Sequence, residues 1–388
     1  MLILMTLACT GDGADSATAS PTIRDVSVVV PGDGLPAEIS PQDANNNLDI
    51  VMHDGRLFLA FRTAPSHFAS DQTVLYVVST TDEQSWRYEG EFFMETDLRE
   101  PRFLSWDGRL FLYFAELGDT ISDFEPKGAW TSEWTGEATW TTPVPLMKET
   151  SGFIPWRTRA IDGMPYMVGY TGGENIYDLN GEPLSIFLLT TRDGLSWEAV
   201  VDGQPVVDEG GGSETDFAIL DDGSLVAVER DEAGSELGWG SRICRAEANA
   251  WADWTCEHDP RKYDSPLVFT HNETVYLIGR RNVTETGHYD LGMDELSPAD
   301  QSIQYQLDYW NNPKRCSLWQ VDPDALSVEF VLDLPSRGDT CFASAIQQSD
   351  TEWLIYNYSS PVDGADVTWL EGQQGQTHIY RMILEFPP

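Results

Sequence analysis

The amino-acid sequence predicts an all-β protein, specifically a six-bladed β-propeller of four-stranded antiparallel blades. An alternating apolar strand, a tight polar turn and a second alternating strand follow one another six times along the chain. The turns recur about every 50 to 60 residues, with one interval of about 78, and a period near 50 residues is typical of a propeller blade. No helix-length stretch with a 3.6-residue period competes with this pattern. We therefore expect a single propeller domain over residues 22–388.

The six hairpins are the strongest local signal, because Asp-Gly between two alternating runs favours the tight turns that join antiparallel strands. Their predicted spans are Leu48–Arg62, Arg99–Ala115, Trp156–Tyr170, Glu214–Arg230, Asp264–Arg280 and Phe342–Tyr358. Each hairpin supplies the two inner strands of one blade.

Third and fourth strands follow most hairpins, as in Val74–Ser79 and Arg87–Phe92 after the first. The sixth blade has no clear fourth strand after Tyr380–Glu385. An open sheet would leave an exposed edge there, and the alternating segment Thr22–Val30 can cover it. We expect this N-terminal strand to close the ring. The long interval before the last hairpin contains an excursion from about Val283 to Asn312.

The charge balance restricts the partners. The formal net charge is −41, with 23 Lys and Arg against 64 Asp and Glu. Nucleic acid is excluded as a partner, because its phosphates are bound by clustered Lys and Arg. The acidity fits the solvated surface of an exported protein, or structural calcium held by surface carboxylates. No cofactor and no catalytic metal are expected.

The N-terminal residues resemble the end of a bacterial lipoprotein signal, with an apolar segment and a small residue before Cys9. We expect residues 1–21 to be a signal and flexible tether, with lipidation at Cys9. An ordinary signal with an incidental cysteine is the alternative. Both place the protein outside the cytoplasm, in the bacterial cell envelope or secreted. Membrane contact is expected only through the lipid, and the protein is expected to be a monomer.

Four further cysteines fit an oxidising compartment. We expect two disulfides, Cys244–Cys256 and Cys316–Cys341, because each pair brackets a single strand connection. The two other pairings remain open. A zinc site is disfavoured, since no spacing is Cys-x2-Cys.

Charged residues gather at the ends of the hairpins, and both ends of every hairpin surround one mouth of a propeller's central channel. Arginine forks there can bind carboxylates or sugar hydroxyls, and neighbouring carboxylates can act as general acid and base. The candidate substrate-binding residues are Arg62, Arg99, Arg102, Arg157, Arg159, Arg230, Arg280, Asp264 and Tyr170. Mutual neutralisation of these charges around a water-filled channel is the alternative.

Two loops, Thr80–Trp86 and Thr191–Trp197, resemble the Asp-box turn of the sialidase superfamily. Arg99-Glu100-Pro101-Arg102, then Ser213–Asp216, then Asp264 add to the likeness. The resemblance implies a six-bladed glycosidase propeller. By position, the arginines that would bind a substrate carboxylate are Arg62, Arg102, Arg159 and Arg280. The resemblance further implies Glu214 as the activating carboxylate, Tyr358 as the nucleophile and Asp49 as the acid/base. The Arg-Ile-Pro that opens true sialidases is absent, and the nearest phrase is Phe61–Pro65.

Two alternatives stand beside this. The chain also resembles the arabinanase and invertase propellers, in which Asp49, Glu100 and Glu214 would be the catalytic residues; those propellers have five blades, and Glu100 replaces their usual Asp. A non-catalytic cell-surface propeller that binds glycan or protein at the same mouth belongs to a different class. Carbohydrate is the expected substrate or ligand.

Overall fold

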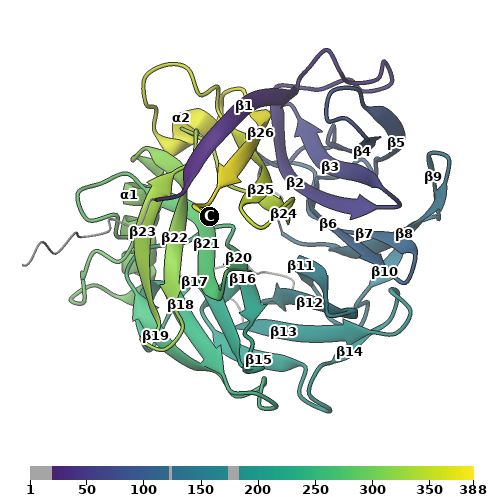
Figure 1. Cartoon of the computed structure of the whole chain (residues 1–388). Helices are drawn as coiled ribbons and strands as arrows, with labels where there is room; N and C mark the ends of the chain where they lie inside the picture. The colour runs from purple at the N-terminus through teal and green to yellow at the C-terminus, as the bar shows by residue number, and fades with distance from the viewer. Residues whose placement is uncertain (1–19, 122–124, 174–182) are drawn as a thin grey trace, which may run out of the picture.

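The computed structural model describes residues 20–121, 125–173 and 183–388. Six antiparallel sheets stand around a central axis like the blades of a fan (Figure 1). This confirms the predicted six-bladed β-propeller. The signal and Cys9 lie outside the described residues. Among the described residues no helix is long and apolar enough to cross a membrane.

The blades are numbered along the chain, and each runs from its inner strand outward. Blade 1 comprises β2 (Ala44–His53), β3 (Arg56–Ala64), β4 (Val74–Thr80) and β5 (Arg87–Phe92). Blade 2 comprises β6 (Leu98–Trp106), β7 (Arg109–Glu116), β8 (Gly128–Gly136), β10 (Val144–Leu146) and the short β9 (Thr139–Trp140) beside β8. Blade 3 comprises β11 (Ile154–Ile161), β12 (Met164–Thr171), β13 (Leu184–Thr191), β14 (Trp197–Ala199) and β15 (Val206–Gly210), which also pairs with β13.

The second half of the ring has the same order. Blade 4 comprises β16 (Gly212–Ile219), β17 (Leu225–Ser235), β18 (Gly238–Ala246) and β19 (Thr255–Asp259). Blade 5 comprises β20 (Leu267–His271), β21 (Thr274–Asn282), β22 (Lys314–Asp322) and β23 (Ser327–Asp333). Blade 6 comprises β24 (Ser344–Gln347), β25 (Glu352–Ser359), β26 (His378–Glu385) and β1 (Thr22–Val30).

The ring closes as expected. β1 pairs antiparallel with β26, so the first strand of the chain completes the last blade. Val29 and Val30 are buried there. Arg24 adds ion pairs to Glu352 and Glu385, which are partly exposed and contribute little compared with the backbone pairing. The closure leaves β26 without a free edge.

All six predicted hairpins are present. In three of them the two turn residues are both left-handed, Asp followed by Gly, at Asp54-Gly55, Asp107-Gly108 and Asp162-Gly163. Two successive positive φ angles define the turn that matches the twist of a hairpin, and Gly and Asp adopt them at low cost. The dipeptide therefore sets each turn locally.

The excursion before blade 6 contains a helix, so the expectation of no helical stretch was wrong. α1 (Pro298–Trp310) begins at the cap Ser297 and buries Gln301, Tyr305 and Tyr309. Its buried face is polar and aromatic rather than aliphatic, and that weakens the apolar period by which helices are recognised. A second, short helix, α2 (Trp369–Gln373), follows β25 and packs on α1, with the rings of Tyr309 and Trp369 5.4 Å apart.

Both expected disulfides are present. Cys244–Cys256 joins the neighbouring strands β18 and β19. Cys316–Cys341 joins β22 to the segment before β24, and so links blade 5 to blade 6. The first disulfide therefore restrains the two outer strands of blade 4, and the second restrains the junction between blades 5 and 6.

A chain that begins at Gly32 tests the closure. It lacks β1, exposes the edge of β26 and loses two buried valines, each worth about 1.5 to 3 kcal/mol. We expect the free energy of unfolding in urea to fall by at least about 3 kcal/mol, with concentration-dependent association. A chain beginning at Ser20 is the control and should match the full chain. Equal stability of the two truncations would show that β1 does not hold the ring.

Candidate functional site

The inner strands bulge where they enter the mouth of the channel. A register shift interrupts the pairing of the innermost strand near its first residues in four blades, in β2, β6, β11 and β16. Asn47, Glu100, Ser265 and Cys341 adopt left-handed φ angles of 41°, 52°, 55° and 83°. Bulges redirect side chains, and non-glycine residues in this region are strained and cluster at functional sites. Strained backbone is therefore concentrated at this mouth.

The segments that open neighbouring blades contact one another. The side-chain amide of Asn47 donates to both carboxylate oxygens of Glu100 at 3.1 Å. In blades 4 and 5 the backbone N–H of Ser265 donates to Oε2 of Glu214 at 2.6 Å. Both glutamates thus carry their carboxyl groups into the mouth, held from the adjacent blade.

One guanidinium links two carboxyl groups at blade 4. Nη1 of Arg230 lies 2.7 Å from Oε1 of Glu214, and Nη2 lies 3.3 Å from Oε1 of Glu232. The ammonium of Lys262 donates to the other oxygen of Glu232 at 2.9 Å. The side chains of Glu214 and Arg230 are 12% and 11% exposed, and that of Glu232 is 26% exposed. Solvent or a ligand therefore reaches both carboxyl groups.

The two carboxyl groups differ in proton affinity. Burial, assisted by the nearby Asp264 and Glu100 and opposed by Arg230, raises the pKa of Glu214 to about 7. Burial would also raise the pKa of Glu232, but Arg230 and Lys262 together lower it. Glu214 therefore exchanges its proton near neutral pH, where Glu232 is ionised.

Asp264 anchors the adjoining cations. Its Oδ2 accepts hydrogen bonds from Arg280 and from the hydroxyl of Tyr309, both at 2.7 Å. Burial opposes its ionisation, yet Lys262, Arg280 and Arg230 lower its pKa well below the usual range. This carboxylate is 1% exposed, so it orients the cations rather than meeting a ligand.

Blade 1 contributes a buried arginine and a histidine. Arg62 is fully buried, donates to Asp97 at 2.7 Å, and also donates to the carbonyls of Ser66 and Phe68. Between those two residues, Nδ1 of His67 lies 2.7 Å from Oδ2 of Asp339. Sequence reasoning missed His67 and its carboxylate, because the connection that holds His67 has no periodic pattern.

Below the mouth, an arginine and two aromatic rings fill the channel. The guanidinium of Arg102 lies 4.2 Å from the ring centroid of Phe342 and 5.1 Å from that of Trp156. The two rings come from blades 3 and 6, which face each other, and their centroids are 5.4 Å apart. Arg102 is fully buried, and none of its three guanidinium nitrogens has a hydrogen-bond partner among the described residues. This plug forms the floor of the site.

Arg157 and Arg159 line the wall beside the plug. Arg157 donates to the carbonyls of Pro266 and Ala343, and burial together with the charge of Arg102 lowers its pKa to about 9. Arg159 donates to the carbonyl of Val268 at 2.9 Å and pairs with Asp216. Their guanidinium groups are therefore already bonded to residues at the starts of blades 4, 5 and 6.

Three other predicted residues lie away from the exposed carboxyl groups. Asp49 lies mid-strand in β2, where it accepts from the hydroxyl of Ser344 at 2.6 Å and the backbone N–H of Phe103 at 2.8 Å. Tyr358 is 2% exposed and donates to Asp339 at 3.0 Å, and burial raises its pKa well above the usual range. Tyr170 is 3% exposed and packs against Trp156.

The structure therefore brings Glu100, Glu214, Arg230, Asp264 and Arg280 together at the mouth, with Arg99 bound to Asp97 beside them. Glu232, Lys262, Asp97, His67 and Asp339 complete the cluster and were not anticipated. Glu232 carried a signal, since it lies two residues after Arg230 on the same strand and therefore on the same face. Across the described residues, no three His, Cys, Asp or Glu side chains are arranged to hold a metal ion.

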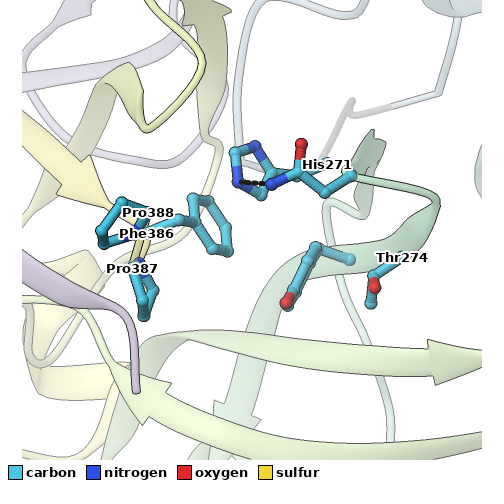
Figure 2. A pocket seen from close by; sticks show the side chains of 7 residues that line it. His271, Thr274, Phe386, Pro387 and Pro388 are labelled. Carbon is cyan, nitrogen blue, oxygen red and sulfur yellow. Dashed lines mark hydrogen bonds between the residues drawn. The ribbon is translucent and has the colours of Figure 1, made fainter. Parts of the chain in front are cut away.

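A separate pocket of about 490 Å³ lies at the turn between β20 and β21, at the opposite end of that hairpin from the mouth (Figure 2). The ring of Phe386 stacks on His271 with centroids 3.9 Å apart. Nδ1 of His271 accepts from the indole N–H of Trp353 at 3.1 Å. Its lining residues include no Asp, Glu, Lys or Arg side chain, in contrast to the mouth.

Comparison with known proteins supports the fold. Neither the models of known protein families nor the sequences of curated proteins match this chain. Among solved structures, a protein of unknown function from Dyadobacter fermentans DSM 18053 is similar over 95% of this chain and 100% of its own, with a TM-score of 0.62 and 14% identity. Trypanosoma rangeli sialidase in complex with sialic acid has a TM-score of 0.55 and 12% identity, over 88% of this chain and 54% of its own.

The endosialidase of phage phi92 is also similar, with a TM-score of 0.59 and 11% identity over 94% of this chain and 69% of its own. This chain therefore spans about half the length of the trypanosomal sialidase and about two thirds of the phage enzyme. At these identities the likeness concerns the fold, which is that of a sialidase-like six-bladed propeller.

The raised pKa of Glu214 gives a pH-dependent stability that can be measured. The native state holds this proton up to a pKa of about 7, whereas the unfolded chain releases it near the ordinary glutamate pKa of 4.5. Between those values the free energy of unfolding should fall as pH rises, by up to about 1.4 kcal/mol per pH unit. Glu214→Gln should lose this component, so the variant gains relative to wild type from pH 5 to pH 7. Urea unfolding at four pH values, with the exposed Glu209→Gln as control, measures the difference; parallel curves for all three proteins would contradict the assignment.

Proposed function

We propose that this chain is a glycoside hydrolase that binds carbohydrate at the channel mouth. The observation that carries the proposal is the pair Glu214 and Glu232 on one guanidinium, with proton affinities shifted in opposite directions. Two carboxyl groups, one protonated and one ionised, are the equipment for cleaving a glycosidic bond. The similarity to sialidases supports a sugar as the substrate.

In this proposal Glu214 donates its proton to the oxygen of the leaving group. Glu232 stays ionised and stabilises the positive charge that develops at the anomeric carbon. Arg230 positions both carboxyl groups, and Lys262 keeps Glu232 ionised. No cofactor takes part.

The geometry favours Glu214 over Asp49 and Tyr358, which the sialidase resemblance implies as acid/base and nucleophile. Both oxygens of Asp49 are already occupied by Ser344 and Phe103, and its carboxylate joins blades 6, 1 and 2. Tyr358 is buried, its hydroxyl donates to Asp339, and its raised pKa keeps it neutral, so it supplies no phenolate nucleophile. The proposed chemistry uses neither as a reacting group.

We also propose that the protein works outside the cytoplasm as a monomer, anchored through a lipid on Cys9 or secreted. The two disulfides support an oxidising compartment. A net charge of −41 suits a protein that stays soluble there.

Hydrolysis of a panel of aryl glycosides, sialosides included, tests the function. Wild type should release the aryl group from one sugar class, and Glu214→Gln should lower kcat at least about 100-fold, because general acid catalysis contributes that much or more. Glu209→Gln, which changes an exposed carboxylate on β15, should keep the wild-type rate. Full activity of Glu214→Gln would contradict the role of this residue.

A non-catalytic glycan-binding propeller is the second candidate. In it Arg230, whose side chain is 11% exposed, would meet the glycan, because Arg62, Arg157 and Arg280 donate to protein groups and are only 0 to 5% exposed. An intact substrate panel together with glycan-array binding that is lost in Arg230→Met would establish the binding module instead.

A further inference from the structure

The connection that carries His67 is held with unusual completeness by buried cations. Arg62 donates to the carbonyl of the residue before His67 and to that of the residue after it. Arg99 donates to the carbonyl of His67 itself, and the His67 N–H donates to the carbonyl of Gln373 at 3.3 Å. Burying two arginines costs desolvation free energy. Such firm support is typical of a loop whose side chain must be held in one position.

The imidazole is oriented as firmly as its backbone. Nδ1 lies 2.7 Å from Oδ2 of Asp339, which is fully buried. The other oxygen of Asp339 accepts from the hydroxyl of Tyr358 at 3.0 Å and the indole N–H of Trp369 at 3.1 Å. An ionised carboxylate can only accept, so the network assigns the proton to Nδ1 and leaves the lone pair on Nε2.

That lone pair belongs to a side chain that a ligand can reach. The imidazole is 16% exposed, and no group of the described residues hydrogen-bonds to Nε2. Burial lowers the pKa of His67, and Arg99 and Arg62 lower it further, against the opposing effect of Asp339. These are the charged groups that face the ring from the elements packed on it, and Trp369 of α2 adds only an uncharged ring. The imidazole is therefore neutral at pH 7, the form that accepts a proton.

The ring places this base across the channel from the acid. His67 follows β3 in blade 1, and Glu214 lies on β16 in blade 4. In a ring of six blades, the first and fourth face each other across the axis (Figure 1). An inverting glycosidase needs its acid and base on opposite faces of the sugar, with room for a water between sugar and base.

We propose that His67 is the general base that activates the hydrolytic water, with Asp339 as its positioning residue. This rests on the proposed function and adds the group that takes the proton. An O–H bond of water breaks and its proton passes to Nε2 of His67, while the water oxygen bonds to the anomeric carbon. The glycosidic C–O bond breaks, and its electron pair remains on the leaving oxygen, which takes the proton of Glu214. Solvent then carries the proton from His67 back to Glu214. The product has the inverted configuration.

Chemical rescue distinguishes a base from a structural side chain. His67→Ala should lower kcat at least about 100-fold on the substrate that wild type cleaves. Added imidazole should restore part of the rate in proportion to its concentration, because it can occupy the vacated space and accept the proton. His271→Ala is the control: it also removes a hydrogen-bonded imidazole, but one at the opposite end of its hairpin from the mouth. It should show a wild-type rate per folded molecule and no response to imidazole.

The anomeric outcome and Asp339→Asn complete the test. Proton NMR of the fresh product should show inversion, and Asp339→Asn should lower kcat with little change in KM and should alter the acid limb of kcat/KM. Retention of configuration would contradict the role of His67 as the base. Undiminished turnover by His67→Ala while Glu214→Gln is inactive would contradict it too, and in both cases the proposed hydrolase function would remain. Absence of turnover by wild type on every substrate would remove both.

Discussion

Every buried carboxylate at the channel mouth has to be matched by a cation, and this sequence holds few cations. There are 23 Lys and Arg residues against 64 Asp and Glu. Removing an unpaired charge from water costs several kcal/mol, so a folded chain of this composition must place its cations where the buried acids are. Two of the four lysines, Lys262 and Lys314, are buried beside Tyr309, with their ammonium groups 4.0 and 3.9 Å from its ring centroid.

The carboxyl groups at the mouth do not all have the same number of cationic partners, and their pKa values therefore differ. Asp264 and Asp339 are surrounded by donors and have lowered pKa values, so they act as fixed negative charges. Glu214 is buried, shares its guanidinium with Glu232 and faces further acids, so its pKa is raised to about 7. Burial also lowers the pKa of Lys314 to about 6, assisted by Arg280 and Lys262. Burial and the charges of the partners together thus give neighbouring carboxyl groups different proton affinities.

Local signals explain how much of this molecule could be predicted. Asp-Gly turns and period-two strands are set by neighbouring residues, so the hairpins followed from the sequence, and β1 followed from the need to cover an edge. Because the hairpin ends must surround the mouth, Glu214, Arg230 and Asp264 were predicted together. α1 was missed because Gln301, Tyr305 and Tyr309 form its buried face, where helix recognition expects aliphatic residues.

The remainder of the site depends on contacts between segments far apart in the chain. His67 and Asp339 are separated by 272 residues, and neither lies in a strand. Their meeting requires the ring to close, which brings blade 6 beside blade 1, and requires Arg62 to fix the connection after β3. Asp49 shows the converse: its place near a hairpin end suggested chemistry, whereas its depth in β2 gives its two oxygens to blades 6 and 2. In this propeller the residue type indicates which side chains can react, and closure of the ring decides which of them meet.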